Sequence, residues 1–187
     1  MYWTQEDISG RFNPSELAQV ADASWVTEFG HKWDALTLVI GWANHIEKLD
    51  HDRGLSWDDH SVWNEYDLVA ALTLRDILVT ALDRLPAGLA SRFADLTDEA
   101  DEHFRSFTVE DSGVRMARIA ASPNVTDTPV SDDWWWHRVP VDGPVAIDLS
   151  HYDTAGNYVG PSESDESRLA TPPVGHDDSA VPGPEAG

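Results

Sequence analysis

The sequence predicts a mainly α-helical protein: an antiparallel helical bundle of about four helices, an extended Trp-rich C-terminal strap and a disordered tail. Three observations lead to this prediction. Apolar residues recur at spacings of three and four over most of residues 13–107. Short turns separate successive helical runs, which favours antiparallel neighbours. Prolines become frequent from residue 123 onward, where long helices are therefore excluded.

The first two helices are predicted from a start signal and from periodicity. Asn13 is expected as the N-cap, Pro14 as the first helical residue, and Glu16 as the side chain that reaches back to the cap. This helix is expected to pause near Gly30. A second run then places five apolar residues on one side, before a polar loop at residues 50–54: Trp33, Leu36, Ile40, Ala43 and Ile46.

The third predicted helix begins near residues 56–59 and ends at Leu85, before the turn at Pro86 and Gly88. Its expected inward stripe combines aromatic, small and aliphatic residues: Trp63, Tyr66, Ala70, Thr73, Ile77, Ala81 and Leu85.

The fourth predicted helix has the clearest separation of apolar and acidic faces. Its apolar face consists of Leu89, Phe93, Leu96, Ala100, Phe104 and Phe107. Its acidic face consists of Asp95, Asp98, Glu99 and Glu102. A shorter helix is expected at residues 114–120.

The C-terminal third is predicted to lack long helices. Residues 134–136 are three consecutive tryptophans, followed by His137 and Arg138. They are interpreted as a strap that covers the open end of the bundle, or alternatively as a binding edge, because Trp and Arg are enriched at interface hot spots. Residues 160–187 hold five prolines and four glycines and few large apolar side chains, which predicts disorder. The expected organisation is an acidic domain at residues 1–150 and a flexible tail at 151–187.

Acidity is the main functional signal in the composition. The 187 residues carry 34 acidic and 12 basic side chains, a net charge of −22. Such a charge repels nucleic acid and anionic membrane surfaces and attracts basic proteins. We therefore expect a basic protein partner, and no direct binding to nucleic acid or membrane. A salt-adapted or GC-rich host is a second explanation for the same acidity.

The compartment is predicted from what the sequence lacks. It has no cysteine, so disulfides, thiolate metal sites and cysteine nucleophiles are excluded. The first ten residues show no basic segment followed by an apolar one, and no apolar stretch approaches the ~20 residues of a membrane span. A cytoplasmic protein is expected.

Motifs for catalysis are not evident. The sequence contains no Gly-x-Ser-x-Gly elbow and neither of the common Gly-rich phosphate loops. A carboxylate–histidine metal site between two helices is one alternative, using His45, Glu47, Glu99 and His103. It lacks a second Glu-x-x-His motif, so no metal, cofactor or catalytic residue is predicted, and enzyme function is the minority hypothesis.

Residues 28–36 read EFGHKWDAL and resemble a segment of the barstar family, in which an aromatic-Gly turn leads into a helix beginning Asn-x-Asp-Ala-Leu. Barstar-type proteins inhibit basic ribonucleases with an acidic helix and an adjacent loop. The resemblance implies that Asp34 is a carboxylate aimed at the active site of a basic nuclease. It covers nine residues, Lys32 stands where the family has Asn, and the family's parallel sheet has no counterpart in the predicted helices.

These observations predict an acidic protein-binding module, most concretely an immunity or inhibitor protein that neutralises a basic effector such as a nuclease toxin. Opposed electrostatic fields accelerate such an association. The alternatives are a DNA mimic that blocks a nucleic-acid-binding protein, and a helical-bundle metal protein or enzyme. The residues predicted to bind the partner are Asp34, Asp50, Asp52, Trp57, Asp58, Asp59, Asp95, Asp98, Glu99 and Glu102.

Overall fold

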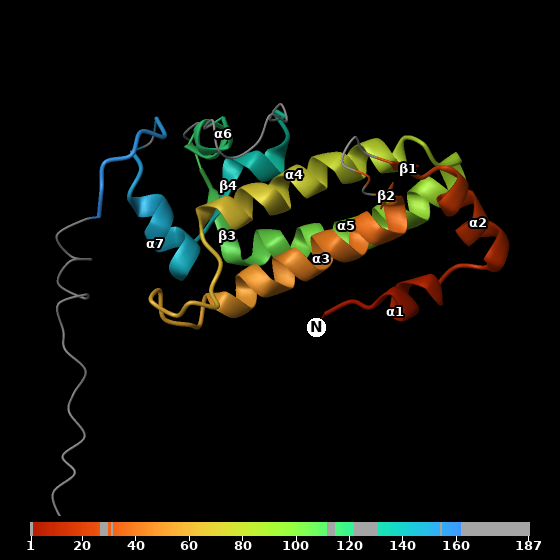
Figure 1. The fold of residues 1–187 in the computed structure, drawn as a ribbon, viewed down its shortest axis with the longest axis horizontal. Coiled ribbons are helices and arrows are strands. Elements are labelled where there is room, and N and C mark those ends of the chain that lie inside the picture. The colour runs from red at the N-terminus through yellow and green to blue at the C-terminus, as the bar shows by residue number, and fades with distance from the viewer. Residues whose placement is uncertain are drawn as a thin grey trace, which may run out of the picture.

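Three long helices lie side by side and form the body of the protein (Figure 1): α3 (Ala35–Asp52), α4 (Glu65–Leu82) and α5 (Ala87–Phe107). Helix α4 runs antiparallel to the other two, and α3 contacts both neighbours extensively. The computed structural model describes residues 2–26, 30, 32–111, 115–121, 131–153 and 155–161. The mainly helical prediction is confirmed, but the helix predicted to begin at Asn13 is only the nine-residue α2 (Pro14–Asp22).

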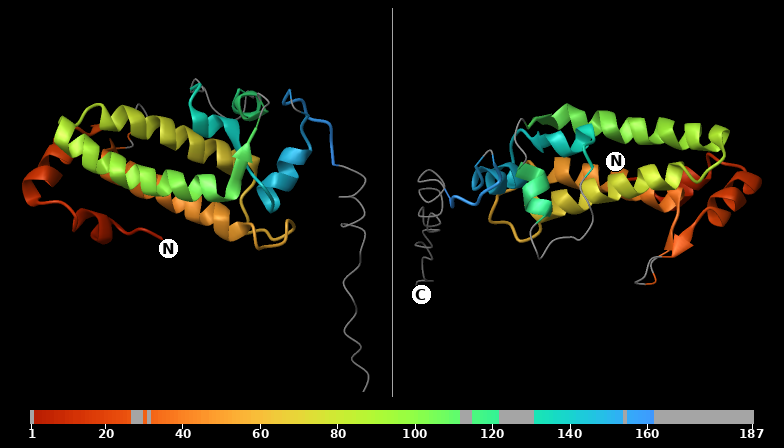
Figure 2. Two further views of the ribbon diagram at one scale, coloured as in Figure 1. Left: turned by 180° about the vertical axis from the view of Figure 1, so that it is seen from behind. Right: turned by 90° about the horizontal axis from the view of Figure 1, so that it is seen from above.

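Shorter elements cover the two ends of the long helices (Figure 2). One end carries α2 and a hairpin of β1 (Trp25–Val26) and β2 (Lys32–Trp33), while α1 (Gln5–Ser9) packs along α3. The other end carries β3 (Thr108–Glu110), α6 (Arg115–Ala120), the 3-10 helix η1 (Trp134–His137), β4 (Arg138–Pro140) and α7 (Pro144–Ser150). Strands β3 and β4 pair antiparallel, with Glu110 opposite Arg138.

Side-chain caps set the starts of two helices. The predicted start at Asn13 is confirmed, because its side chain accepts bonds from the Ser15 and Glu16 amides while Glu16 reaches back to the Asn13 amide. The predicted start of the third helix at residues 56–59 is wrong. Helix α4 begins at Glu65, since Asn64 forms an equivalent capping box with Asp67.

The core lies between the inward faces of the three long helices. The apolar face predicted for α5 is confirmed at all six positions, since Leu89, Phe93, Leu96, Ala100, Phe104 and Phe107 are buried. The stripe predicted for the third helix is confirmed only in part: Ala81 and Leu85 are buried, but Tyr66 and Ala70 are exposed. The buried residues of α4 are Leu68, Val69, Ala71, Leu72, Arg75, Leu78 and Ala81. Helix α4 is apolar on most sides, so its periodicity did not identify one inward face.

Two tryptophans predicted on helices form a hairpin instead. Trp25 and Trp33 are direct cross-strand partners in the β1–β2 pair. Arg84, which follows α4, lies over the Trp25 ring at 4.3 Å. Cross-strand pairing of large side chains stabilises such a short ladder, which the helical spacing of the sequence did not indicate.

The consecutive tryptophans are not an extended strap in the described residues. They form the 3-10 helix η1, and the buried Trp135 and Trp136 indoles both donate to the Asp76 carboxylate, at 2.8 and 2.9 Å. Neighbouring side chains of a strand point to opposite faces, whereas the tight turn of η1 lets both indoles reach one carboxylate. Arg138, expected to pair with a surface acid, donates to the Thr108 hydroxyl and to the Thr108 and Arg105 carbonyls.

The first residues assigned to the tail have defined structure. His151 is buried, Tyr152 pairs with Tyr158 across an isolated bridge, and the Val159 amide donates to the His151 carbonyl at 2.7 Å. Residues 162–187, the greater part of the predicted tail, lie outside the described residues. Across the described chain, no helix combines the length and apolar character needed to span a membrane.

Candidate functional site

The outer face of α5 presents the acidic stripe predicted from the sequence. Asp95, Asp98, Glu99 and Glu102 are all exposed, because the opposite side of the helix is buried in the core. Within the described residues, the carboxylates of Asp95, Asp98 and Glu102 make no hydrogen bond or ion pair, and only Glu99 approaches a cation, Arg11, at 3.9 Å. Three neighbouring carboxylates on this helix are therefore available to a partner.

A small groove joins this stripe to α3. Glu99 and His103 of α5, Glu47 of α3 and Trp3 of the N-terminal arm line a pocket of about 190 Å³. His103 Nε2 lies 2.9 Å from the Asp50 carboxylate, and its Nδ1 lies 3.9 Å from that of Glu47. The structure thus brings the predicted residues Asp50 and Glu99 to one groove through a histidine.

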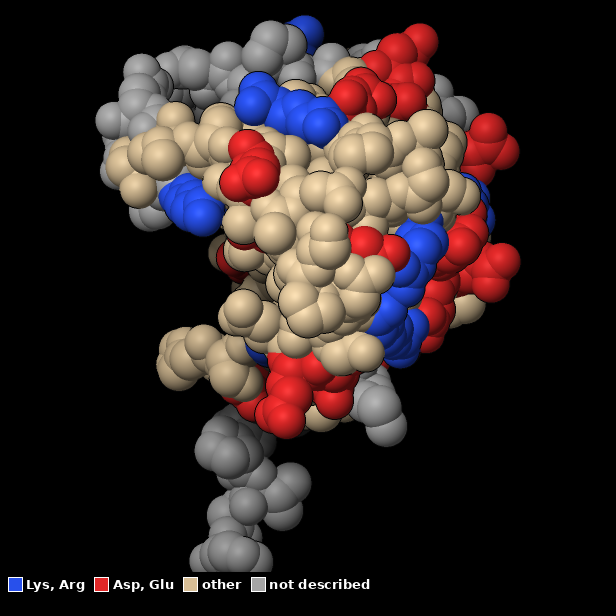
Figure 3. Space-filling model, turned by 90° about the vertical axis from the view of Figure 1, so that its right-hand side faces the viewer, with Lys and Arg blue, Asp and Glu red and all other residues tan. Residues whose placement is uncertain are grey.

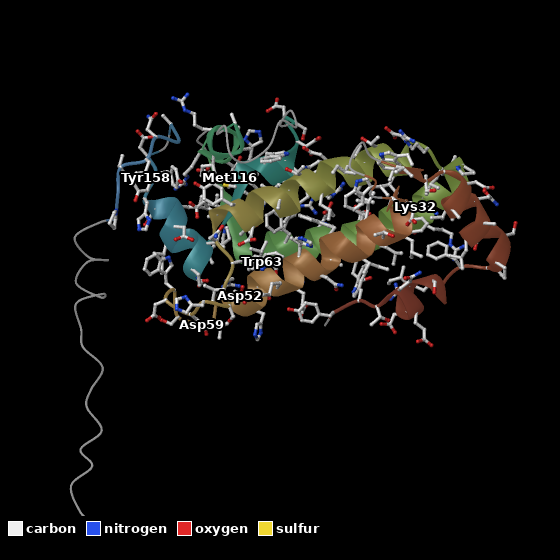
Figure 4. The ribbon with its side chains drawn as sticks, viewed as in Figure 1. Lys32, Asp52, Asp59, Trp63, Met116 and Tyr158 are labelled. Atoms are coloured by element: carbon white, nitrogen blue, oxygen red, sulfur yellow. The ribbon has the colours of Figure 1, made fainter. Side chains whose placement is uncertain are left out.

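Asp52 is not a surface residue, and its predicted role in partner binding is wrong. Its side chain is 1% exposed and accepts hydrogen bonds from Lys48 Nζ, at 2.5 Å, and from the Trp63 amide, at 2.9 Å. Figure 4 shows Asp52 and Trp63 close together where α3 ends. A buried carboxylate requires such partners, so Asp52 holds the α3–α4 connection to the end of α3.

The other acids of this loop lie on the surface but have local structural roles. The amide and hydroxyl of Ser61 donate to Asp59, and these bonds hold the pKa of Asp59 below its usual range. Asp58 accepts a bond from the Ser56 hydroxyl at 2.5 Å. The expected aromatic anchor, Trp57, is partly exposed, but its indole N–H donates to Asp148 of α7 at 2.6 Å.

Asp34, which the barstar-like segment implied as a partner contact, is the N-cap of α3. Its carboxylate accepts a bond from the Thr37 amide at 2.8 Å. Residues 28, 29 and 31 of that segment lie outside the described residues. Asp34 therefore has a structural role at the start of α3.

Charge is not uniform over the surface. Figure 3 views the end that carries α2 and the α4–α5 turn, where acidic side chains gather toward the rim and basic side chains lie among them. The centre of this end is largely uncharged. Arg92 forms an ion pair with Glu16 at this end. Acidic groups at this end are thus partly neutralised, unlike those of the α5 stripe.

A buried polar cluster links all three long helices, and sequence reasoning missed it. Asp101 of α5 accepts bonds from Trp42 Nε1 at 2.9 Å, Arg75 Nε at 3.0 Å and Arg75 Nη2 at 2.8 Å. The Arg75 guanidinium also lies 4.3 Å from the Trp135 ring. In the sequence, Arg75 stands in an apolar helix and Asp101 lies on the apolar side of the next one. These two features do not indicate that the two residues pair with each other.

A second pocket, which the sequence did not predict, combines a carboxyl group of raised pKa with three tyrosines. Its volume is about 720 Å³, and Glu65, Tyr66, Tyr152 and Tyr158 are among its lining residues. The Tyr152 hydroxyl donates to Glu65 at 3.1 Å. Burial raises the pKa of Glu65, and the neighbouring Asp148 carboxyl raises it further. The sequence predicted Tyr66 as a core residue and assigned residues from 151 onward to the flexible tail. It therefore gave no indication that these side chains share a pocket.

The structure separates the residues of the metal alternative. Glu47, Glu99 and His103 meet at the α3–α5 groove, whereas His45 bonds the Gly41 carbonyl and packs against Trp63. Among the residues that the structure describes, no three His, Asp or Glu side chains are arranged to hold a metal ion. Comparison with protein families, curated proteins and solved structures found no match for this chain.

Proposed function

We propose that this protein is an acidic protein-binding module that uses the outer face of α5 to bind a basic surface of another protein. The most concrete form of the proposal is an inhibitor or immunity protein that neutralises a basic effector, such as a nuclease toxin. One observation carries it: Asp95, Asp98 and Glu102 are exposed and adjacent, and have no partner within the described chain.

Many acids elsewhere in the described chain already have partners within the protein. Asp34, Asp59 and Asp67 cap turns or helices, and Asp52, Asp101 and Asp111 pair with cations. Like charges one turn apart destabilise a helix by a few tenths of a kcal/mol per pair. Residues 93–104 contain no Lys or Arg to offset this repulsion. Binding a cationic surface would therefore reduce the repulsion between these carboxylates.

The extent of the stripe favours inhibition over DNA mimicry. From Asp95 to Glu102 the helix rises by about 10 Å. A mimic needs carboxylates spaced along a longer track that follows a nucleic-acid backbone, whereas one patch suits a basic active site. The groove beside it, with Trp3 and His103, adds aromatic groups to the edge of the patch.

The test reverses two charges, in the variant Asp98→Lys/Glu102→Lys. Partners are first captured with the intact protein, and association rates are then measured at low and high salt. We expect the variant to associate at least tenfold more slowly with a weaker salt dependence, because electrostatic steering is lost. Its melting temperature should be unchanged or slightly higher.

A matched control separates a local surface from total charge. Asp22→Lys/Asp83→Lys makes the same change in net charge at two exposed residues, of which Asp22 ends α2 and Asp83 follows α4. Neither carboxylate has a side-chain partner within the described residues. We expect this control to bind nearly as the wild type does. Equal losses in both variants would mean that overall charge alone drives association, and unaltered binding of the α5 variant would refute the proposed surface.

A further inference from the structure

The second pocket lies at the end of the bundle opposite α2, between the first turn of α4, helix α6 and the turn formed by residues 151–153 and 155–159. Glu65 and Tyr66 come from α4, Arg118 from α6, and Tyr152, Gly156 and Tyr158 from the turn. Figure 4 shows Tyr158 at this end, on the same side as Met116 of α6. The turn is seated closely on α6, since a Cβ at Gly156 would lie 2.5 Å from Arg118 Cβ.

Two carboxyl groups meet at one side of this pocket. Burial raises the pKa of Glu65, and the neighbouring Asp148 carboxyl raises it further. Trp57 Nε1 donates to Asp148 at 2.6 Å and the Tyr152 hydroxyl donates to Glu65 at 3.1 Å. No Lys or Arg forms an ion pair with either group in the described part of the chain.

Tyrosine rings form the walls around these acceptors. The Tyr152 and Tyr158 rings meet edge to face with centroids 5.4 Å apart, and Tyr152 also bonds Tyr66. Tyr158 is 66% exposed and Tyr66 is 45% exposed. Exposed aromatic faces beside a carboxylate are the surroundings that organic cations prefer, because the ring face carries partial negative charge.

We propose that this pocket binds the ammonium group of an alkylamine, with Glu65 as its ion-pair partner and the rings of Tyr66, Tyr152 and Tyr158 around it. The same chemistry occurs in a free amine and in a lysine side chain of a protein. The site is separate from the α5 stripe, so it goes beyond the proposed function and can exist whether or not that proposal holds.

The charges around the pocket favour a cation over an anion. Glu65 lines the pocket and the Asp148 carboxyl lies near Glu65, while the protein as a whole carries −22. Arg118 is the opposing charge in the lining, and its guanidinium donates to Asn157 Oδ1 at 3.2 Å. His151 contacts both Trp57 and Tyr158, with ring centroids 6.3 and 6.4 Å apart.

The raised pKa of Glu65 gives the binding a distinctive pH dependence. An ammonium ion favours the ionised form of Glu65, so binding to the protonated Glu65 carboxyl releases its proton. We expect affinity to increase as pH rises through the pKa of Glu65, and protons to be released on binding. Glu65→Gln should abolish both effects, since its amide cannot ionise.

The experiment titrates the full-length protein with Nα-acetyl-lysine methylamide, followed by NMR and by calorimetry in buffers of different ionisation enthalpy. Nα-acetyl-norleucine methylamide is the uncharged probe, and 1,5-diaminopentane represents a free amine. We expect signals of Tyr152 and Tyr158 to shift with the two ammonium probes only. A lysine derivative that binds much better than the free diamine would identify a protein side chain as the source, and the reverse order a small metabolite.

Matched variants locate the site. Glu65→Gln and Tyr158→Ala should each weaken ammonium binding at least fivefold. Glu6→Gln and Tyr2→Ala make the same chemical changes at exposed residues of the N-terminal segment and should leave it unchanged. If the ammonium probes cause no shift, or if Glu65→Gln binds them as the wild type does, the proposal is overturned. Neither result depends on the partner captured through α5, so the two proposals fail independently.

Discussion

Replacing Asp101 with Ala tests the buried cluster that joins the three long helices. Asp101 is 2% exposed and Arg75 is 8% exposed, so both charges are removed from bulk water. The substitution deletes the acceptor of three hydrogen bonds, two from Arg75 and one from Trp42. A guanidinium and an indole N–H are then left in the core without this partner.

The expected loss is large relative to the total stability. Breaking a buried ion pair by removing one partner destabilises a protein by about 3–5 kcal/mol. An unsatisfied buried N–H adds about 1–3 kcal/mol. Both effects come from the loss of the same carboxylate, so they are not additive. We expect Asp101→Ala to lower the free energy of unfolding by about 4–6 kcal/mol. Domains of this size have total stabilities of about 5–15 kcal/mol, so the variant will be close to unfolding.

A second variant shows whether the loss comes from the unpaired charge. Arg75→Met/Asp101→Asn removes both charges but keeps an amide oxygen for the Trp42 indole. Replacing both members of a buried ion pair is often nearly neutral, so the double variant should lie within about 2 kcal/mol of the wild type. The single variant Asp101→Asn should fall between the two.

Urea unfolding followed by far-UV circular dichroism measures these differences, with the slope of the transition checked for two-state behaviour. The reasoning is refuted if Asp101→Ala changes the free energy of unfolding by less than about 1 kcal/mol. It is also refuted if the double variant is as unstable as Asp101→Ala. If Asp101→Ala does not fold, the comparison of Asp101→Asn with the double variant gives the same test.

Three further predictions concern the core, the 151–159 turn and pH. Phe93→Ala should destabilise the protein by about 3–5 kcal/mol, because the ring is fully buried and stacks on Phe12; a melting shift of only a degree or two would contradict this. Gly156 and Gly160 both have positive φ, but only Gly156 lies at short range from Arg118. Gly156→Ala should therefore lower the melting temperature more than Gly160→Ala does. Equal effects of the two substitutions would contradict the close packing at Gly156. A carboxyl whose pKa is raised by folding favours the native state below its unfolded pKa and loses that contribution as pH rises through its folded pKa. Glu65→Gln should therefore become more stable relative to the wild type between pH 4 and pH 7, and a constant difference in urea titrations would refute this.

Local signals in the sequence identified the parts of the fold that depend on near neighbours. The capping box at Asn13 and Glu16 was predictable because its partners are three residues apart. The two faces of α5 were predictable because acidic and apolar residues alternate with the helical period. The same periodicity identified the inward face of α4 only in part, because apolar residues surround most of that helix.

The candidate sites depended more on distant contacts. The exposure of Asp95, Asp98 and Glu102 followed from the burial of the opposite face of α5, and the sequence contained that information. Asp52 carries the same side chain in an equally polar stretch, yet it is buried by Lys48 and by the start of the next segment. Composition cannot distinguish an exposed carboxylate from one that the chain itself satisfies.

The sequence by itself determined that the protein is mainly helical, strongly acidic and without cysteine, because these properties follow from composition and short-range spacing. Only the tertiary structure decided which charges remain available. Asp101 pairs with Arg75 across 26 positions, and Tyr152 bonds Glu65 across 87. Such pairings arise because burying a polar group requires a partner, and packing of the helices decides which partner is within reach.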